Sequence, residues 1–257
     1  MASRRHRFEL CYRPGATLTR EQREQLSAEL RALAWRSSSV LLEGEALDDA
    51  VVAIARGTDQ VPLGFRVGRL LPVRPIGPVL HLGLCAVRPG AWAMELAREL
   101  TARLIRGAYV RTRLLGRLWV SSLSRDLDCL REVTRLLEGV FPAPGGPERA
   151  PRTHRLIARA LDRRYRRELG VTAPAAFDDA WFVFRHGARG AARQPSCGPP
   201  PARHDEAVDR FYVEHLRLDA RDEVLQVGWA SGLSLLRCRW RRMARALPRA
   251  RSEAASG

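Results

Sequence analysis

The sequence predicts an α/β fold, a mixed sheet covered by helices, and three observations support this class. Apolar and polar residues alternate from residue 7 to residue 12, which is the period of a half-buried strand. Residues 79–87 are apolar almost throughout, as is typical of a central strand. Four apolar residues then fall four apart and predict a helix over about 92–108 with one apolar face: Leu96, Leu100, Leu104 and Ala108.

The first part of the chain adds a helix and a hairpin to this pattern. Thr19 and Gln22 have the spacing of a helix capping box, and leucines follow at helical intervals (Leu26, Leu30, Leu33). Two apolar segments, residues 51–55 and 63–67, flank a polar turn at 57–59. This arrangement predicts a β-hairpin.

After the predicted helix, the pattern of strands and helices continues. Residues 118–120 predict a short strand, and Ser124 is expected to cap the helix that carries apolar residues as far as Leu137. The proline- and glycine-rich run that opens residues 142–150 predicts a linker. The core is therefore expected to span residues 7–141.

Later elements complete a single predicted domain over residues 1–235. An arginine-studded helix is expected around 157–165, and strands are expected at 181–184 and 224–227. These helices and strands, over 151–235, form a helical insertion and the last strands of the sheet.

Composition sets limits on the class of protein. The 257 residues include 44 basic and 28 acidic side chains, a formal net charge of +16, and 46% apolar residues. The apolar share suits one large core or two modest ones and excludes an acidic disordered tail protein. All 44 basic residues are arginine, a bias that a GC-rich genome produces, so part of the charge reflects codon usage. The charge still attracts anions such as nucleic acid, acidic lipids or phosphorylated cofactors.

The cysteines and the lengths of the apolar runs further limit the class of protein. Five cysteines are scattered without a C-x-x-C pair or a histidine at zinc spacing, so neither disulfides nor a metal site is expected. No segment reaches the roughly 18 apolar residues of a spanning helix, and we expect a cytoplasmic protein. Motifs for phosphoryl transfer, zinc peptidases and α/β-hydrolases are absent from the sequence.

Residues 82–89 read Leu-Gly-Leu-Cys-Ala-Val-Arg-Pro. This segment resembles the fourth strand and following turn of the GNAT acetyltransferase superfamily, where the strand leads into the acyl-CoA pyrophosphate loop. Residues 118–122 and the helix after them resemble the fifth strand and fourth helix of that family. The resemblance covers roughly residues 7–141. It implies an N-acyltransferase that moves an acyl group from acetyl-CoA or a longer acyl-CoA, a thioester, to an amine.

The pyrophosphate loop of the family runs Arg or Gln, two residues, Gly, one residue, and Gly or Ala. Trp92 to Ala97 stand at these positions, and only Ala97 matches, since Glu95 replaces the glycine. A carboxylate about 4 Å from a phosphate costs roughly 4 kcal/mol at an effective dielectric of 20. Glu95 therefore belongs either to a weakened loop or to the ordinary first turn of a helix that no longer binds CoA. The resemblance implies ten cofactor-binding residues: Cys85, Ala86, Val87, Trp92, Ala93, Met94, Glu95, Leu96, Ala97 and Ser122.

His81 and Cys129 are the candidate catalytic residues. His81 is the titratable side chain within the central strand, alternation places it on the face of Gly83 and Cys85, and an imidazole suits proton transfer near neutral pH. The alternative is a strand histidine satisfied by hydrogen bonds. Cys129 is the nearest proton donor because the tyrosine of the family's fourth helix is absent, and its alternative role is core packing. The adjacent serines Ser121 and Ser122 are expected to contact pantetheine or to cap the next helix.

Residues 236–257 predict a basic amphipathic helix and tail. One stripe is apolar (Leu233, Leu236, Trp240, Met243, Leu247), and arginines occupy the other positions (Arg237, Arg239, Arg241, Arg242, Arg245). Such a helix suits peripheral binding to an anionic membrane at its inner face or binding to nucleic acid, or it packs on the domain. The alternative to an enzyme is therefore a non-catalytic GNAT-like scaffold that binds such partners through its arginines.

Overall fold

The computed structural model describes residues 6–34, 47–90, 92–112, 116–171, 174–186, 208, 210–216, 218 and 221–235. Its strands are β1 (Arg7–Tyr12), β2 (Ala50–Arg56), β3 (Pro62–Val73), β4 (Gly77–Val87), β5 (Arg117–Ser124), β6 (Glu138–Phe141), β7 (Ala176–Asp178), β8 (Val183–Arg185) and β9 (Glu223–Ser231). Its helices are α1 (Pro14–Thr17), α2 (Arg20–Leu33), α3 (Ala93–Thr112), α4 (Leu127–Leu136), α5 (Arg152–Arg164), α6 (Arg166–Leu169) and a π-helical turn, η3 (Phe211–His215).

All of these strands belong to one sheet. Eight of them follow the order β1-β2-β3-β4-β5-β9-β8-β7, and β6 pairs with β9 beside this path. Neighbouring strands are antiparallel except β4 and β5, which are parallel. Parallel neighbours need a crossover connection, and α3 provides it. The predicted α/β fold with a mixed sheet is confirmed.

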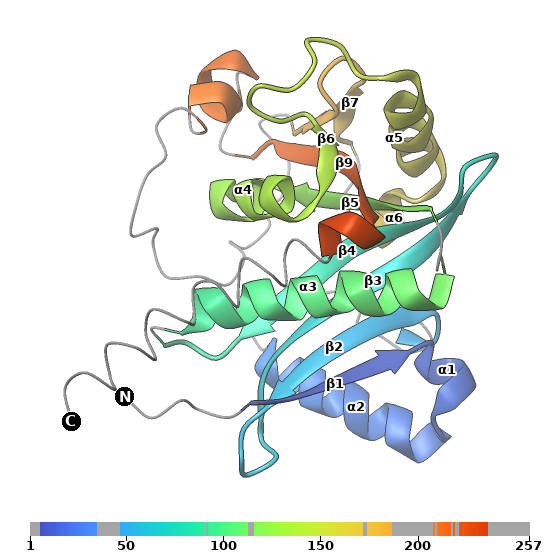
Figure 1. The fold of residues 1–257 in the computed structure, drawn as a ribbon, viewed down its shortest axis with the longest axis vertical. Helices are drawn as coiled ribbons and strands as arrows, with labels where there is room; N and C mark the ends of the chain where they lie inside the picture. The colour runs from blue at the N-terminus through green and yellow to red at the C-terminus, as the bar shows by residue number, and fades with distance from the viewer. Residues whose placement is uncertain are drawn as a thin grey trace.

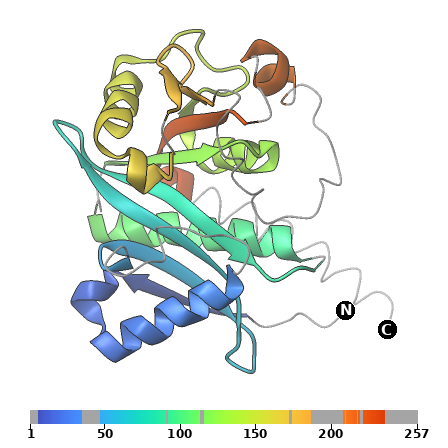
Figure 2. The ribbon, with the colours of Figure 1, turned by 180° about the vertical axis from the view of Figure 1, so that it is seen from behind.

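Helices cover both faces of the sheet. α3 crosses in front of the strands in Figure 1 and lies behind them in Figure 2. Its residues Leu100 and Leu104 are buried in one cluster with Leu80 of β4. On the opposite face, Leu30 of α2 packs over β2 and β3, and Ile157 of α5 packs over the later strands. The face of α3 and the face of α2 and α5 are thus separate apolar layers.

The first half of the chain follows the sequence prediction closely. The Thr19–Gln22 capping box is present, with both reciprocal hydrogen bonds, and opens α2. The predicted hairpin is formed by β2 and β3, and β3 runs on to Val73. Strand β4 and helix α3 lie where the apolar run and the fourfold spacing place them.

Three local expectations are wrong. Asp126 rather than Ser124 caps α4, because its carboxylate accepts from the amides of Asp128 and Cys129, while Ser124 ends β5. The short strand β6 was absent from the sequence prediction, since four residues show no clear period. The strand expected at 181–184 begins only at Val183.

The C-terminal helix expected over residues 236–257 lies outside the described residues, as do its arginines. Binding to a membrane or to nucleic acid through them stays a prediction. In the part of the chain that the structure describes, no helix has both the length and the apolar character needed to cross a membrane.

Candidate functional site

Strands β4 and β5 run together and then part. They pair in parallel over residues 79–82 and 119–122. Beyond these residues, within the described chain, β4 continues to Val87 beside β3, and β5 continues to Ser124 beside β9. We call the parting of the strands after Leu82 and Ser122 the splay. Backbone groups at such an edge can receive an extended ligand as a further strand would be received.

A β-bulge in β4 stands at the start of the splay. Arg66 of β3 faces Cys85 while Gly68 faces Leu82, so β4 has one extra residue between these pairs. Before the bulge, Leu82 packs on the α3 face, and after it Ala86 packs on the α2 face. The extra residue therefore exchanges the two faces of the strand.

The bulge corrects the expected position of His81. Alternation without a bulge predicts that His81 shares a face with Cys85, and this is wrong. Leu80 and Leu82 face α3, so His81 between them faces the opposite side of the sheet. Val87 packs with the α3 cluster, and Cys85, two residues before it, lies on the same face. His81 and Cys85 thus lie on opposite faces of the splay.

His81 is buried and hydrogen-bonded to the neighbouring strand. Its Nδ1 lies 3.1 Å from Oγ of Ser121, its partner in the parallel register, and the residue is 3% exposed. Ser122 follows on the α3 face and pairs in register with Gln226 of β9. Both serines lie inside β5, so the expectation that they cap the next helix is wrong.

The predicted loop residues form the first turn of α3. Ala93 and Leu96 are buried in the core beneath the helix, and Trp92 packs against the same cluster. The amide of Leu96 bonds to the carbonyl of Trp92 at 3.0 Å. Glu95 is exposed, while Met94 and Ala97 are partly buried. Because the buried side chains serve the core, this turn can offer a ligand its backbone and its helix dipole.

Cys129 lies apart from His81 in the layer arrangement. It is a half-buried cysteine, outside any disulfide, in the first turn of α4, and α4 packs with α3 through Val133. His81 faces the other side of the sheet. The two candidate catalytic residues are therefore on opposite sides of the strands.

A buried tyrosine next to α4 was missed by the sequence analysis. The amide nitrogen of Gln226 lies 2.7 Å from the Tyr212 hydroxyl and 3.2 Å from Oγ1 of Thr134 in α4, and Tyr212 donates to the carbonyl of Pro142 at 3.3 Å. Burial raises the pKa of Tyr212 to about 12, so the hydroxyl stays protonated. Tyr212 is fully enclosed and ties η3 to α4 and β9.

An unusual set of charges lies between α3 and α4 and was also missed. Arg98 of α3 and Glu132 of α4 form an ion pair at 2.8 Å. Burial raises the pKa of Glu132, and the charges of Arg98, Arg135 and Arg66 oppose this rise. Arg66 is 9% exposed, and its buried Nε has no hydrogen-bond partner among the described residues. With 44 arginines in the chain, no sequence signal separates these from the rest.

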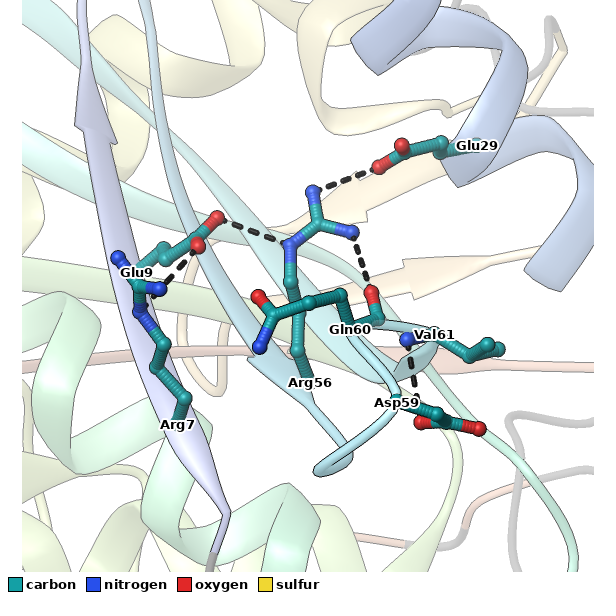
Figure 3. Close-up of polar contacts among 7 residues, drawn as sticks. All are labelled: Arg7, Glu9, Glu29, Arg56, Asp59, Gln60 and Val61. Atoms are coloured by element: carbon teal, nitrogen blue, oxygen red, sulfur yellow. Dashed lines mark hydrogen bonds and ion pairs between the residues drawn. The ribbon is translucent and has the colours of Figure 1, made fainter.

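A second buried arginine, on the same hairpin, is fully surrounded by acceptors (Figure 3). Arg56 donates to Glu9 at 2.9 Å, to Glu29 at 2.7 Å and to the carbonyl of Gln60 at 3.1 Å. Burial disfavours its charge, but the two carboxylates outweigh this and raise the pKa of Arg56. We call these residues the Arg56 cluster. It joins β1, β2 and α2 and lies in the arm of the sheet away from β5.

The described residues contain no group of three histidine, cysteine or acidic side chains placed to hold a metal ion. The class that these features define is an α/β protein with a parallel pair of strands that part beside the N-terminus of a crossover helix.

No protein-family model matches the chain, and no curated protein matches it in sequence.

Several solved acetyltransferases are similar in structure. Aminoglycoside 6'-acetyltransferase type Ii is 18% identical, with 55% of this chain and 89% of that chain covered and a TM-score of 0.34. The aminoglycoside 6'-N-acetyltransferase from Enterococcus faecium is 15% identical, with 55% of this chain and 90% of that chain covered and a TM-score of 0.31. A chain of the NatC complex bound to Gag peptide and CoA is 14% identical, with 50% of this chain and 81% of that chain covered and a TM-score of 0.33. The two aminoglycoside enzymes are acetyltransferases, the activity that the resemblance of residues 82–89 implies.

Proposed function

We propose that this chain is an N-acyltransferase that transfers an acyl group from an acyl-CoA thioester to an amine. The observation that carries the proposal is the splay, which opens at the bulge of β4 and lies beside the first turn of α3. The segment that resembles the GNAT motif, residues 82–89, forms this part of β4. An extended donor with an anionic end suits a strand edge followed by a helix N-terminus.

The donor is held by one face of the splay in this proposal. The backbone of Cys85, Ala86 and Val87 lines the edge of β4, and Ser122 lies across from it in β5. The phosphates of CoA lie at the first turn of α3, residues 92–97, where backbone amides and the helix dipole favour negative charge. Glu95 is exposed there, so its carboxylate can turn toward solvent.

The amine approaches from the other face, where His81 lies. The amine nitrogen forms a bond to the thioester carbonyl carbon, its proton passes to the imidazole of His81, and the C–S bond breaks. Oγ of Ser121 lies 3.1 Å from Nδ1 of His81 and fixes the orientation of the imidazole that takes this proton. Cys129 on the donor side is the candidate that returns a proton to the CoA thiolate. The products are an amide and free CoA.

Thermal unfolding in the presence of acetyl-CoA and longer acyl-CoAs tests this function. A ligand at 100 times its Kd stabilises the folded protein by about 2.7 kcal/mol, and this raises the melting temperature measurably. Two variants of adjacent β5 residues separate the faces. Ser122→Val should weaken donor binding, whereas Ser121→Val should leave donor binding intact and slow the release of free CoA thiol in the presence of an amine.

Circular dichroism and the melting temperature without ligand show that each variant is folded. If no thioester shifts the melting temperature of the wild-type protein, the proposed function is wrong. If both serine variants bind the donor like wild type, the donor lies elsewhere.

A further inference from the structure

Arg66 forms no ion pair with the residues that the structure describes, and a buried cation without a partner is costly in a protein interior. Its residue exposure is 9%, and its Nε is buried without a hydrogen bond. Arginine stays charged at any physiological pH, so burial cannot be relieved by losing a proton. A buried charge that lacks partners in the free protein indicates a partner from outside.

The backbone places Arg66 on the donor side of the splay. It lies between Gly64 and Gly68 on the face of β3 that packs under α3, since a Cβ at these glycines would contact Leu100 and Leu104. Its partner in register is Cys85 of β4. The side chain thus starts one strand away from the splay, beneath α3.

The charge of Arg66 acts toward α4. Glu132 of α4 feels this charge, and α4 packs on β5, β6 and β9, which lie beyond β4. Cys85, the register partner of Arg66, lies on the edge of the splay, so the two residues are cross-strand neighbours there. Glu132 is already paired with Arg98 at 2.8 Å, so it does not neutralise both arginines. The site between α3 and α4 has an excess of positive charge.

The position of Arg66 along the axis of α3 differs from that of the donor phosphates in the proposed complex. Arg66 lies at the level of Leu100 to Leu104, and α3 begins at Ala93. At about 1.5 Å per residue, Leu100 and Leu104 lie roughly 10 and 16 Å along the helix axis from the start of α3, toward the point where the strands begin to part. A donor with its phosphates at the first turn would bring its acyl end, rather than its phosphates, to Arg66.

We propose that Arg66 is a specificity-determining residue for an acyl-CoA whose acyl chain ends in a carboxylate, as in a dicarboxylic acid monothioester. The inference rests on the proposed function and names its donor class. The carboxylate pairs with the guanidinium of Arg66, whose planar donors match two carboxylate oxygens. Arg98 and Glu132 stay paired beside it.

Isothermal titration with succinyl-CoA and butyryl-CoA tests the inference, because the two acyl chains have the same number of carbons and differ in the terminal carboxylate. We expect succinyl-CoA to bind wild type at least roughly tenfold more tightly, the size of one charge-assisted hydrogen bond. Arg66→Met should remove this preference and leave butyryl-CoA binding within about twofold. Arg111→Met, which removes an exposed arginine from the last turn of α3, should keep the preference.

Each other result overturns a stated part of the inference. Equal affinity of wild type for the two donors would mean that Arg66 meets only water, while the proposed function stands. Weaker binding of both donors and of 3',5'-ADP to Arg66→Met would mean that Arg66 holds a phosphate of CoA. Absence of binding by acetyl-CoA, butyryl-CoA and succinyl-CoA alike would overturn the proposed function and this inference together.

Discussion

Arg56 and Arg66 lie on adjacent strands of one hairpin, and both side chains are largely buried. Arg56 is enclosed by two carboxylates and a carbonyl, at 2.7 to 3.1 Å. The buried Nε of Arg66 has no hydrogen-bond partner among the described residues, and Glu132, whose pKa the charge of Arg66 lowers, is paired with Arg98. The first arginine is complete as a structural link between β1, β2 and α2. The second has no ion-pair partner among the described residues, and an added anion would complete it.

The largest expected effect is on the Arg56 cluster. Arg56→Met leaves the partly buried Glu29 without its cation and leaves Glu9 only the exposed Arg7 at 3.8 Å, so we expect a loss of about 2 kcal/mol. We expect the urea midpoint of unfolding to fall while its m-value is unchanged. An unchanged midpoint would mean that solvent already satisfies both carboxylates.

The same substitution at the other arginine should act in the opposite direction. Arg66→Met replaces a buried charge that lacks full compensation with an apolar chain of similar length, so the free protein should gain about 1 kcal/mol. Urea unfolding without ligand measures this gain. A loss of stability would show that Arg66 has a structural partner and would make the two arginines alike.

Removal of one carboxylate should have a smaller effect than removal of the arginine. Glu29→Gln keeps an amide oxygen near Arg56, and Glu9 remains at 2.9 Å, so we expect a loss of about 1 kcal/mol. Arg20→Gln is a matched control, because its ion pair with Glu24 on α2 is exposed. The control should change the urea midpoint less than Glu29→Gln does.

The smallest expected effect is a pH dependence at Glu132. Burial raises its pKa in the folded protein, so the folded state holds this proton to higher pH than the unfolded chain, whose glutamates titrate near about 4.3. This contribution to stability is present below that pH and is lost as pH rises through the folded pKa. The unfolding free energy of wild type should therefore fall relative to Glu132→Gln as pH rises from about 4 toward neutrality. Parallel curves for the two proteins would contradict the prediction.

The fold was predictable where one period dominates a long segment. β4 and α3 each bury a continuous apolar set, and the Thr19 capping box is a local signal that tertiary packing did not alter. β6 has four residues and is a strand because β9 pairs with it, which is information from a distant segment. Ser124 lost its expected capping role because β5 extends to that residue and Asp126 takes the position.

The candidate site was predictable only in part, for two physical reasons. The bulge of β4 places Gly83 and Leu84 opposite Val67 and reverses the face of Cys85, and the isolated Gly83 inside an apolar strand is the sequence signal of a bulge that strict alternation ignores. Arg66 is one arginine among many, and its importance depends on burial without partners, which sequence spacing does not report. His81 and Ser121 become neighbours only through the parallel register of two strands joined by a helix.

The strand order also determines when the splay can form as the chain folds. The strands from β1 to β4 pair with neighbours along the chain, and such local contacts close quickly. β5 ends at Ser124 and its partner β9 begins at Glu223, on the order of a hundred residues later, so this pairing has a large loop-closure cost. During synthesis the edge of β5 that will meet β9 is made long before its partner. The arm formed by β5 and β9 is therefore expected to mature late, after a stable β1–β4 arm with its Arg56 cluster has already formed.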